Sequence, residues 1–181
     1  KKPVILSGGG VAYAGASELL QTFAERYQIP VVTSLLGQGT IATDHPLFLG
    51  MGGMHGTFAA NIAMTEADLM INIGSRFDDR LTGNPKTFAK NAKVVHIDID
   101  PAEIGKIIAV DIPVVGDAKQ ALEMLLAEET VRNNTEKWIA KVTEDKNRVR
   151  SYDRKERVVQ PQPVIERIGE LTNGDAIVVT D

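Results

Sequence analysis

Short runs of apolar, β-branched residues alternate with stretches of helical periodicity over the first 127 residues of the chain. This alternation is typical of βαβ units built around a parallel sheet. The run 69–73 (Leu-Met-Ile-Asn-Ile) is almost wholly apolar, as expected of a strand that is covered on both faces. We therefore predict an α/β fold with an open, mainly parallel sheet and helices on both faces. Its strands are expected at residues 3–7, 30–34, 69–73, 94–99 and 112–115.

Apolar positions that step by three and four residues predict the helices between these strands. One such stripe covers residues 16–27, and a second covers residues 118–126, where Asp117 is placed to cap the helix. A third helix, of weaker periodicity, is expected from about residue 57 to residue 66.

The composition changes at Glu128. Of the 30 residues from 128 to 157, 16 are charged, nine of them basic and seven acidic. Because the two signs are interleaved, a solvated helix that lies across the domain or leads away from it is favoured over a basic binding surface. Trp138, Ile139 and Val142 give this helix a thin apolar stripe. Residues 160–163 (Gln-Pro-Gln-Pro) then indicate a linker.

The chain is therefore expected to have three parts. Residues 1–127 form a ligand-binding domain, residues 128–160 a charged helix and linker, and residues 161–181 the start of a following domain. The last part combines a short amphipathic helix at 164–171 with a strand-like run at 176–181, after which this sequence has no further element. We expect the sequence to be a piece of a longer protein, and the alternative is an edge strand that closes the sheet.

Composition narrows the function classes. The 181 residues include 20 basic and 24 acidic ones, and the formal net charge of −4 argues against nucleic acid as a partner. No apolar run approaches the roughly 18 residues that a membrane-spanning helix needs. The chain has no cysteine, which excludes disulfides, cysteine metal sites and thiol nucleophiles. Its three histidines have no metal-ligand spacing, so we expect no metal site.

Two glycine-rich segments are candidate ligand loops. Gly8-Gly9-Gly10 follows the first strand, where glycines let backbone N–H groups approach an anion. The third glycine of the dinucleotide fingerprint is replaced by Tyr13, so a tight turn without a ligand explains the segment equally well. Residues 50–57 (Gly-Met-Gly-Gly-Met-His-Gly-Thr) form an open loop of the kind that binds ligands at the ends of parallel strands. A packing or hydrogen-bonding role is favoured for His55 over general-base chemistry.

Charged residues follow the later strands. Residues 74–80 (Gly-Ser-Arg-Phe-Asp-Asp-Arg) suit either a bound phosphate or a self-satisfied ion-pair loop. His96, Asp98 and Asp100 alternate along the next strand, and a carboxylate at such a strand end commonly accepts hydrogen bonds from a ribose. Residues 114–117 (Val-Val-Gly-Asp) repeat the order of strand, small residue and acid. Together these strand ends predict one nucleotide-binding crevice without evident catalytic machinery, since no nucleophile elbow or Gly-Lys-Ser/Thr loop occurs.

Six segments resemble, in the same order, the central domain of the acetohydroxyacid synthase (acetolactate synthase) catalytic subunit, a thiamine diphosphate-dependent enzyme of three domains. The resemblance covers essentially the whole chain, and its most specific part is the pair Arg-Phe-Asp-Asp-Arg and His-Ile-Asp-Ile-Asp. It implies a Rossmann-like central domain that holds FAD in a structural rather than a redox role. The segments are residues 8–10, 33–39, 53–57, 74–80, 96–104 and 114–117.

Carried over position by position, the resemblance implies FAD contacts along the strand ends. Beside the diphosphate and at the loop of the second strand these are Gly8, Gly9, Gly10, Ser34, Leu35 and Leu36. Near the flavin they are Gly53, Met54, His55 and Gly56. The phosphate and ribityl region would be lined by Gly74, Ser75, Arg76, Asp78 and Arg80, and the adenosine end by Asp98, Ile99, Gly116 and Asp117. The positions of Asp79 and Arg80 also match the mouth of the family's substrate channel.

The resemblance also implies what other parts of the parent enzyme supply. The glutamate that activates the thiazolium belongs to the family's first domain, and the Gly-Asp-Gly motif for Mg²⁺ and thiamine diphosphate belongs to the third. The chain alone is therefore expected to be inactive and to bind FAD weakly, because the flavin spans more than one domain in the family.

The parent would be a cytoplasmic enzyme of branched-chain amino-acid biosynthesis, assuming a bacterial source. It would condense two pyruvates, or pyruvate with 2-oxobutyrate, and release CO₂. Its partners would be the other domains of the same chain, a catalytic-subunit dimer or tetramer and a small regulatory subunit, with no nucleic acid and no membrane. The alternatives are the central domain of a relative such as glyoxylate carboligase or pyruvate oxidase, and a non-catalytic nucleotide-binding module.

Overall fold

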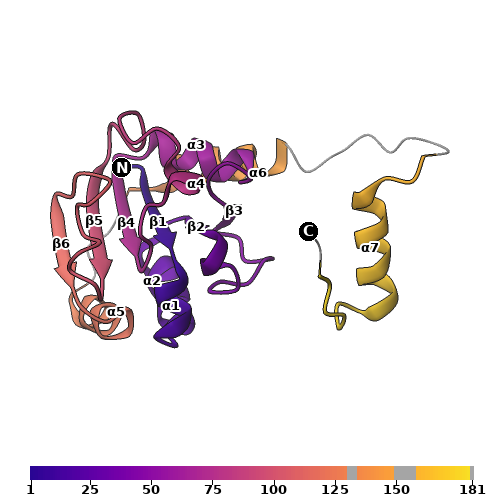
Figure 1. The fold of residues 1–181 in the computed structure, drawn as a ribbon, viewed down its shortest axis with the longest axis horizontal. Helices are drawn as coiled ribbons and strands as arrows, with labels where there is room; N and C mark the ends of the chain where they lie inside the picture. The colour runs from indigo at the N-terminus through magenta and orange to yellow at the C-terminus, as the bar shows by residue number, and fades with distance from the viewer. Residues whose placement is uncertain (130–133, 149–157, 180–181) are drawn as a thin grey trace. The chain divides into compact units, whose positions relative to one another are not determined.

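Six parallel strands form one sheet in the first part of the chain (Figure 1). The computed structural model describes residues 1–129, 134–148 and 158–179, and it divides the chain into two units, Lys1–Arg148 and Val149–Asp181. The strands of the first unit are β1 (Pro3–Ser7), β2 (Val31–Thr33), β3 (Phe48–Met51), β4 (Leu69–Ile73), β5 (Lys93–Asp98) and β6 (Ile112–Val115). The predicted α/β fold with a parallel sheet is confirmed.

Helices connect the strands of this unit. They are α1 (Gly9–Tyr13), α2 (Ser17–Tyr27), the 3₁₀ turn η1 (Leu35–Gly37), α3 (Phe58–Glu66), α4 (Asp79–Thr82), α5 (Ala118–Ala127) and α6 (Glu136–Arg148). Two side-chain caps explain where α3 and α5 start. Thr57 Oγ1 accepts a hydrogen bond from the Ala60 N–H at 3.2 Å, and Asp117 Oδ1 accepts from the N–H groups of Lys119 and Gln120 at 2.9 and 3.2 Å. The cap predicted at Asp117 is confirmed.

The strand order β3-β2-β1-β4-β5-β6 places β1 at the centre of the sheet. The chain runs outward from β1 to β2 and β3, and then crosses over to β4 on the other side of β1. The order therefore reverses between β1 and β4. Because all strands are parallel, their carboxyl ends meet at one edge, and ligands of open α/β sheets bind in the crevice at such a reversal point.

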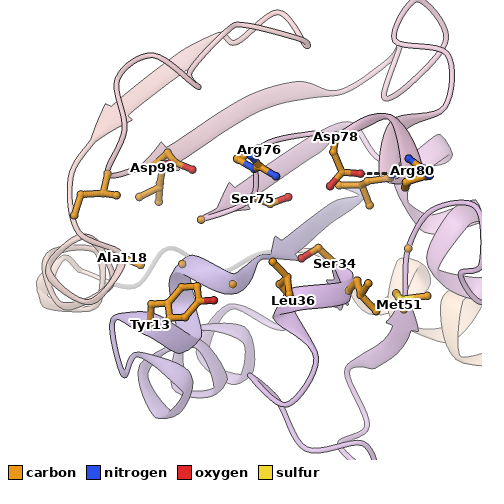
Figure 2. Close-up of a pocket in the computed structure, with 18 of the residues that line it drawn as sticks. Tyr13, Ser34, Leu36, Met51, Ser75, Arg76, Asp78, Arg80, Asp98 and Ala118 are labelled. Carbon is orange, nitrogen blue, oxygen red and sulfur yellow. Dashed lines mark hydrogen bonds between the residues drawn. The ribbon is translucent and has the colours of Figure 1, made fainter. Parts of the chain in front are cut away.

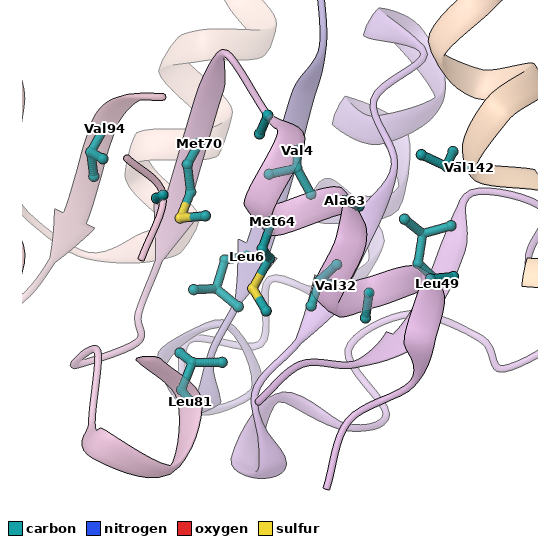
Figure 3. Packing of buried hydrophobic residues seen from close by; sticks show 14 of the residues in the cluster. Val4, Leu6, Val32, Leu49, Ala63, Met64, Met70, Leu81, Val94 and Val142 are labelled. Carbon is teal, nitrogen blue, oxygen red and sulfur yellow. The ribbon is translucent and has the colours of Figure 1, made fainter. Parts of the chain in front are cut away.

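Each face of the sheet is covered by its own apolar core. One core joins Val4, Leu6 and Met70 to residues of α3 and α6 (Figure 3). The other joins Ile5, Ile71 and Ile97 to residues of α2 and α5. Successive residues of a strand point to opposite faces, so the apolar run of β1 supplies both cores.

The charged helix α6 packs on the first unit and does not lead away from it. Its Trp138 is 3 % exposed and donates a hydrogen bond from Nε1 to the Pro3 carbonyl oxygen at 2.8 Å. Lys141 of the same helix is half-buried and pairs with Glu66 of α3 at 3.1 Å and with Asp145 at 2.9 Å. The hydrogen bond to Asp145 is the main reason why the pKa of Lys141 is raised. Two buried apolar residues one turn apart, Trp138 and Val142, thus fix a helix whose remaining surface is mostly solvated.

The second unit contains the helix α7 (Pro161–Thr172), which starts earlier than predicted. The linker prediction for 160–163 is wrong from Pro161 onward. An N–H group in the first helical turn has no intrahelical acceptor, so a proline there loses no hydrogen bond, and its fixed φ suits the helix. The final strand predicted from residue 176 is also wrong for 176–179, which pair with no strand within the described ranges. Residues 180–181, and the stretch 149–157 of the predicted charged segment and linker, lie outside the described residues.

Two further findings complete the fold. The strand β3 was not expected, and it extends the sheet beyond β2. No helix in the described parts of the chain has the length and apolar character that crossing a bilayer requires.

Candidate functional site

A cavity of about 1050 Å³ lies at the carboxyl edge of the sheet. Residues that follow β1, β2 and β3 line one wall, and residues that follow β4, β5 and β6 line the opposite wall (Figure 2). In Figure 2 the side chains of Tyr13, Ser34 and Leu36 face those of Arg76 and Asp98 across this space. The cavity therefore occupies the reversal point of the strand order, where a ligand of such a sheet is expected.

The predicted site residues converge on this cavity, with three exceptions. Gly8, Gly53 and Gly56 do not line it. Those that do are Gly9, Gly10, Ser34, Leu35, Leu36, Met54, His55, Gly74, Ser75, Arg76, Asp78, Asp79, Arg80, Asp98, Ile99, Gly116 and Asp117. The strand ends thus share one groove, which is the condition for a single ligand to contact all of them.

The glycines after β1 serve the packing of two loops. A Cβ atom on Gly8 would overlap the Gly74 carbonyl oxygen and lie 2.7 Å from Ser75 Cα, and one on Gly10 would lie 2.7 Å from Gly74 Cα. Hydrogen bonds from the Gly8 N–H to Ile73 O (2.8 Å) and from the Gly10 N–H to Gly74 O (3.1 Å) hold this contact. Gly8 and Gly10 therefore let the loop after β1 touch the loop after β4, and only Gly9 and Gly10 border the cavity.

The glycines of the 50–57 loop shape the chain around Met54 and His55. Gly53 has a φ of +101°, and Asn61 Oδ1 accepts from the Gly53 N–H at 2.8 Å while Asn61 Nδ2 donates to the Gly53 carbonyl at 2.9 Å. A Cβ atom on Gly56 would lie 2.5 Å from the Met51 carbonyl oxygen. This tight loop leaves the side chain of Met54 67 % exposed at the cavity.

The loop after β4 carries the charged residues of the cavity. Asp78 Oδ1 accepts from the Leu81 N–H at 3.1 Å and so caps the short helix α4. Arg80 lies 3.5 Å from Asp79 Oδ1, and both side chains are exposed. Arg76 has no hydrogen-bonding or ionic partner among the described residues (Figure 2). The loop is therefore not a self-satisfied set of ion pairs, because one guanidinium is left for a ligand.

Two buried polar side chains lie directly beneath this loop. Asn72 of β4 and His96 of β5 are opposite each other in the sheet and fully buried. Both donate to the carbonyl oxygen of Ser75, Asn72 from Nδ2 at 2.6 Å and His96 from Nε2 at 3.0 Å. Burial lowers the pKa of His96, and the nearby Asp98 carboxylate opposes this effect only in part. His96 is thus neutral at neutral pH and keeps its proton on Nε2.

The end of the cavity at β5 and β6 combines acceptors with an exposed apolar side chain. Asp98 Oδ1 accepts from the Asp100 N–H at 2.9 Å, which leaves Oδ2 without a hydrogen bond inside 3.5 Å in the described structure. Ile99 is 71 % exposed. A Cβ atom on Gly116 would meet nothing within 4 Å, so this position opens onto free space at the cavity wall.

Exposed apolar side chains occur at both ends of the cavity. Leu35 (69 % exposed), Leu36 and Met54 lie at the β2–β3 end, and Ile99 lies at the β5–β6 end. The walls also include glycine backbone, the polar loop after β4 and the exposed ring of Tyr13. A grouping of exposed apolar side chains in a concave site marks a place where an organic ligand or a partner is bound. This distribution suits an extended ligand with a ring system at each end and a polar, anionic middle.

Seven lining residues were absent from the sequence-based prediction. They are Tyr13, Ala14, Met51, Gly52, Leu81, Ile97 and Ala118. Tyr13 occupies the place of a fingerprint glycine, and Met51 ends the strand β3 that was not predicted. Ala118 follows the cap Asp117 directly, so the cap itself was a signal that could have identified it.

Comparisons with known proteins agree with this architecture. The model of the family described as "Thiamine pyrophosphate enzyme, central domain" matches residues 1–125. The acetolactate synthase large subunit of Lactococcus lactis subsp. lactis is 53 % identical over 182 residues, which covers 100 % of this chain and 32 % of the relative.

Two further relatives have similar coverage. A probable acetolactate synthase large subunit of Methanocaldococcus jannaschii is 49 % identical over 96 % of this chain and 30 % of the relative. The Escherichia coli acetolactate synthase isozyme 3 large subunit is 43 % identical over 100 % of this chain and 33 % of the relative. The chain thus spans about a third of the length of the curated relatives it matches. The resemblance stated from the motifs is confirmed, and the chain belongs to the family of thiamine pyrophosphate enzyme central domains.

Proposed function

We propose that this chain is the central domain of an acetolactate synthase large subunit and that its cavity holds FAD. The observation that carries the proposal is the alignment of the entire chain, at 53 % identity, with an acetolactate synthase large subunit. Because the chain spans about a third of that relative, the remaining functions of the enzyme would be supplied by sequence outside these 181 residues.

The cavity supports FAD as its ligand in three ways. Its volume of about 1050 Å³ slightly exceeds the range of about 300–1000 Å³ for small-molecule sites, which favours a dinucleotide over a mononucleotide. Leu35, Leu36 and Met54 would pack against the flavin ring, and Ile99 against the adenine. Arg76 would offset part of the negative charge of the diphosphate, and Asp98 Oδ2 would accept a hydrogen bond from a ribose hydroxyl.

The proposed parent reaction joins two molecules of pyruvate. Loss of CO₂ from one molecule leaves a two-carbon unit that bonds to the carbonyl carbon of the second, and the product is 2-acetolactate; with 2-oxobutyrate as the second acid the product is the homologous acetohydroxy acid. Thiamine diphosphate and Mg²⁺, bound by other domains, would supply the carbanion chemistry of this step. No electrons are lost or gained in the sum, so FAD would act as a structural element.

Within that reaction this chain's residues bind and position. Asp79 and Arg80 line the cavity with exposed side chains, and the Arg80 guanidinium would attract the carboxylate of an incoming keto acid. The parent would be a cytoplasmic biosynthetic enzyme that assembles from large subunits. The phrase "large subunit" in the names of the relatives supports a smaller regulatory partner as well.

The test is an assay of the full-length protein with pyruvate, thiamine diphosphate, Mg²⁺ and FAD. We expect one 2-acetolactate for each CO₂ released, with no consumption of O₂, and no activity from the 181-residue chain alone. Release of CO₂ with consumption of O₂ and no acetolactate would contradict the proposal and favour an oxidase.

A further inference from the structure

Asn72 is out of place in an otherwise apolar strand. It lies in β4, whose other residues are Leu69, Met70, Ile71 and Ile73, and both faces of that strand are covered. His96 lies beside it in β5 and is also fully buried. Burial of a polar side chain in such a position is unfavourable unless all of its polar atoms find partners.

The two side chains are only partly satisfied within the described structure. Each makes a hydrogen bond to the same acceptor, the Ser75 carbonyl oxygen, which has two lone pairs and so accepts both. Asn72 Oδ1 and His96 Nδ1 have no partner among the described residues. Apolar residues at both positions would continue the core of β4 and β5 without these unpaired atoms. The stability of the sheet therefore does not explain the pair, and features that break a local folding rule are expected where function requires them.

The loop above the pair has a conformation that needs external support. Within four residues, Gly74 has a φ of +64° and Phe77, a bulky residue, has a φ of +56°. Such a φ is strained for a residue other than glycine. Phe77 is held in place because its ring is buried and packs edge-on against His96, with ring centroids 5.1 Å apart. Ser75 and Arg76 lie between these two turns and reach the cavity.

We propose that Asn72 and His96 are positioning residues that clamp the Ser75 carbonyl and thereby fix the loop 74–78 in its ligand-binding conformation. Neither side chain lines the cavity, so each acts on the ligand through the loop. His96 holds the loop at two points, at the Ser75 carbonyl through Nε2 and at Phe77 through the contact of the two rings. This arrangement keeps the unpaired Arg76 guanidinium oriented toward the anionic middle of the ligand. The inference rests on the proposed function in that FAD is the ligand used in its test.

Two variants of the full-length protein separate positioning from folding. Asn72→Leu removes one donor and continues the apolar core, and His96→Gln keeps a donor near the place of Nε2 but lacks the ring that Phe77 contacts. The matched control is Thr33→Val, because Thr33 Oγ1 is likewise buried and unpaired in the described structure but lies in β2, which β1 separates from β4 and its loop. Hydrogen exchange of peptides that cover residues 74–78 reports on the loop without any ligand, and flavin fluorescence anisotropy gives the Kd for FAD.

In Asn72→Leu we expect the loop amides to exchange about tenfold faster and the Kd for FAD to rise about tenfold, the size of one lost hydrogen bond. The Tm of this variant is expected to be equal to or above that of the wild type. His96→Gln is expected to show a smaller effect, and Thr33→Val none. Loop exchange in Asn72→Leu equal to that of the wild type would overturn the clamp. An unchanged Kd despite a faster loop would overturn its role in binding. If the wild type fails to bind FAD, the proposed function fails, while the exchange data still decide whether the clamp exists.

Discussion

The substitution Gly8→Ala tests the contact between the loops after β1 and β4. A methyl group at this position would overlap the Gly74 carbonyl oxygen and lie 2.7 Å from Ser75 Cα, closer than the 3.0 Å that real Cβ atoms respect. The backbone of the loop after β4 would have to move, since no flexible side chain is available to yield. Such overpacking costs about 1–3 kcal/mol.

Two hydrogen bonds depend on the same contact, from the Gly8 N–H to Ile73 O and from the Gly10 N–H to Gly74 O. Their weakening adds about 0.5–1.5 kcal/mol each. The alanine restricts the unfolded chain and returns about 0.4–1 kcal/mol. We therefore expect the free energy of unfolding to fall by about 1–5.5 kcal/mol, which is a shift of about 0.5–2.8 M in the urea midpoint at a typical m value of about 2 kcal/mol/M.

Trp138 offers a direct assay of this change. It is the single tryptophan of the chain and is buried in the core between the sheet and α6, so its fluorescence follows unfolding of the first unit in urea. The matched control is Gly116→Ala, where a Cβ atom meets nothing within 4 Å and the midpoint is expected to stay within about 0.3 M of the wild type. Equal midpoints for the two variants would refute the reasoning, because the steric overlap would then carry no cost.

Three further variants test the cap, the free cation and the buried histidine. Asp117→Ala removes the acceptor for two N–H groups of α5 and should lower the free energy of unfolding in urea by about 1 kcal/mol. Asp117→Asn should keep most of the cap, and an equal decrease for both variants would contradict this. Arg76→Ala should weaken FAD binding by about 10–100-fold in anisotropy titrations without a change in Tm, because the exposed guanidinium has no protein partner in the described structure; an unchanged Kd would exclude it from the ligand site. Burial lowers the pKa of His96 below its usual 6.5, so the unfolded state binds the proton more tightly than the folded state. The contribution of His96 to the free energy of unfolding is therefore full above pH 6.5 and is lost as the pH falls toward the pKa of the folded state. Urea unfolding between pH 7.5 and about pH 5 should therefore show a smaller loss of stability in His96→Gln than in the wild type, and parallel curves would contradict the assignment of a neutral, buried imidazole.

The periodic parts of the fold follow from the sequence because a buried parallel strand and an amphipathic helix each leave a regular pattern. The strands Pro3–Ser7, Leu69–Ile73 and Ile112–Val115 have the predicted bounds. The strand Phe48–Met51 was not predicted because its four residues include Gly50 at a φ of +105° and no β-branched residue. The sequence does not distinguish the first turn of α7 from a linker, because Pro161 and Pro163 suit a helix start as well as an extended segment.

The location of the cavity was predictable and part of its construction was not. Parallel strands bring their carboxyl ends together, so loops after different strands converge without any knowledge of side-chain contacts. The packing of Gly8 against Gly74 joins residues 66 positions apart, and no local pattern marks such a contact. The same holds for the two donors on the Ser75 carbonyl, since the sequence shows Asn72 only as a polar exception in an apolar run.

The most direct test of the account is a titration of the full-length protein with FAD, followed by flavin anisotropy, in the wild type and in Gly116→Trp. The indole would project from a position that opens onto free space at the cavity wall and would occupy the adenosine end. The account predicts saturable binding of one FAD per chain to the wild type and at least a tenfold higher Kd for the variant at unchanged Tm. Absence of saturable binding to the wild type, or equal affinity in the two proteins, would contradict it.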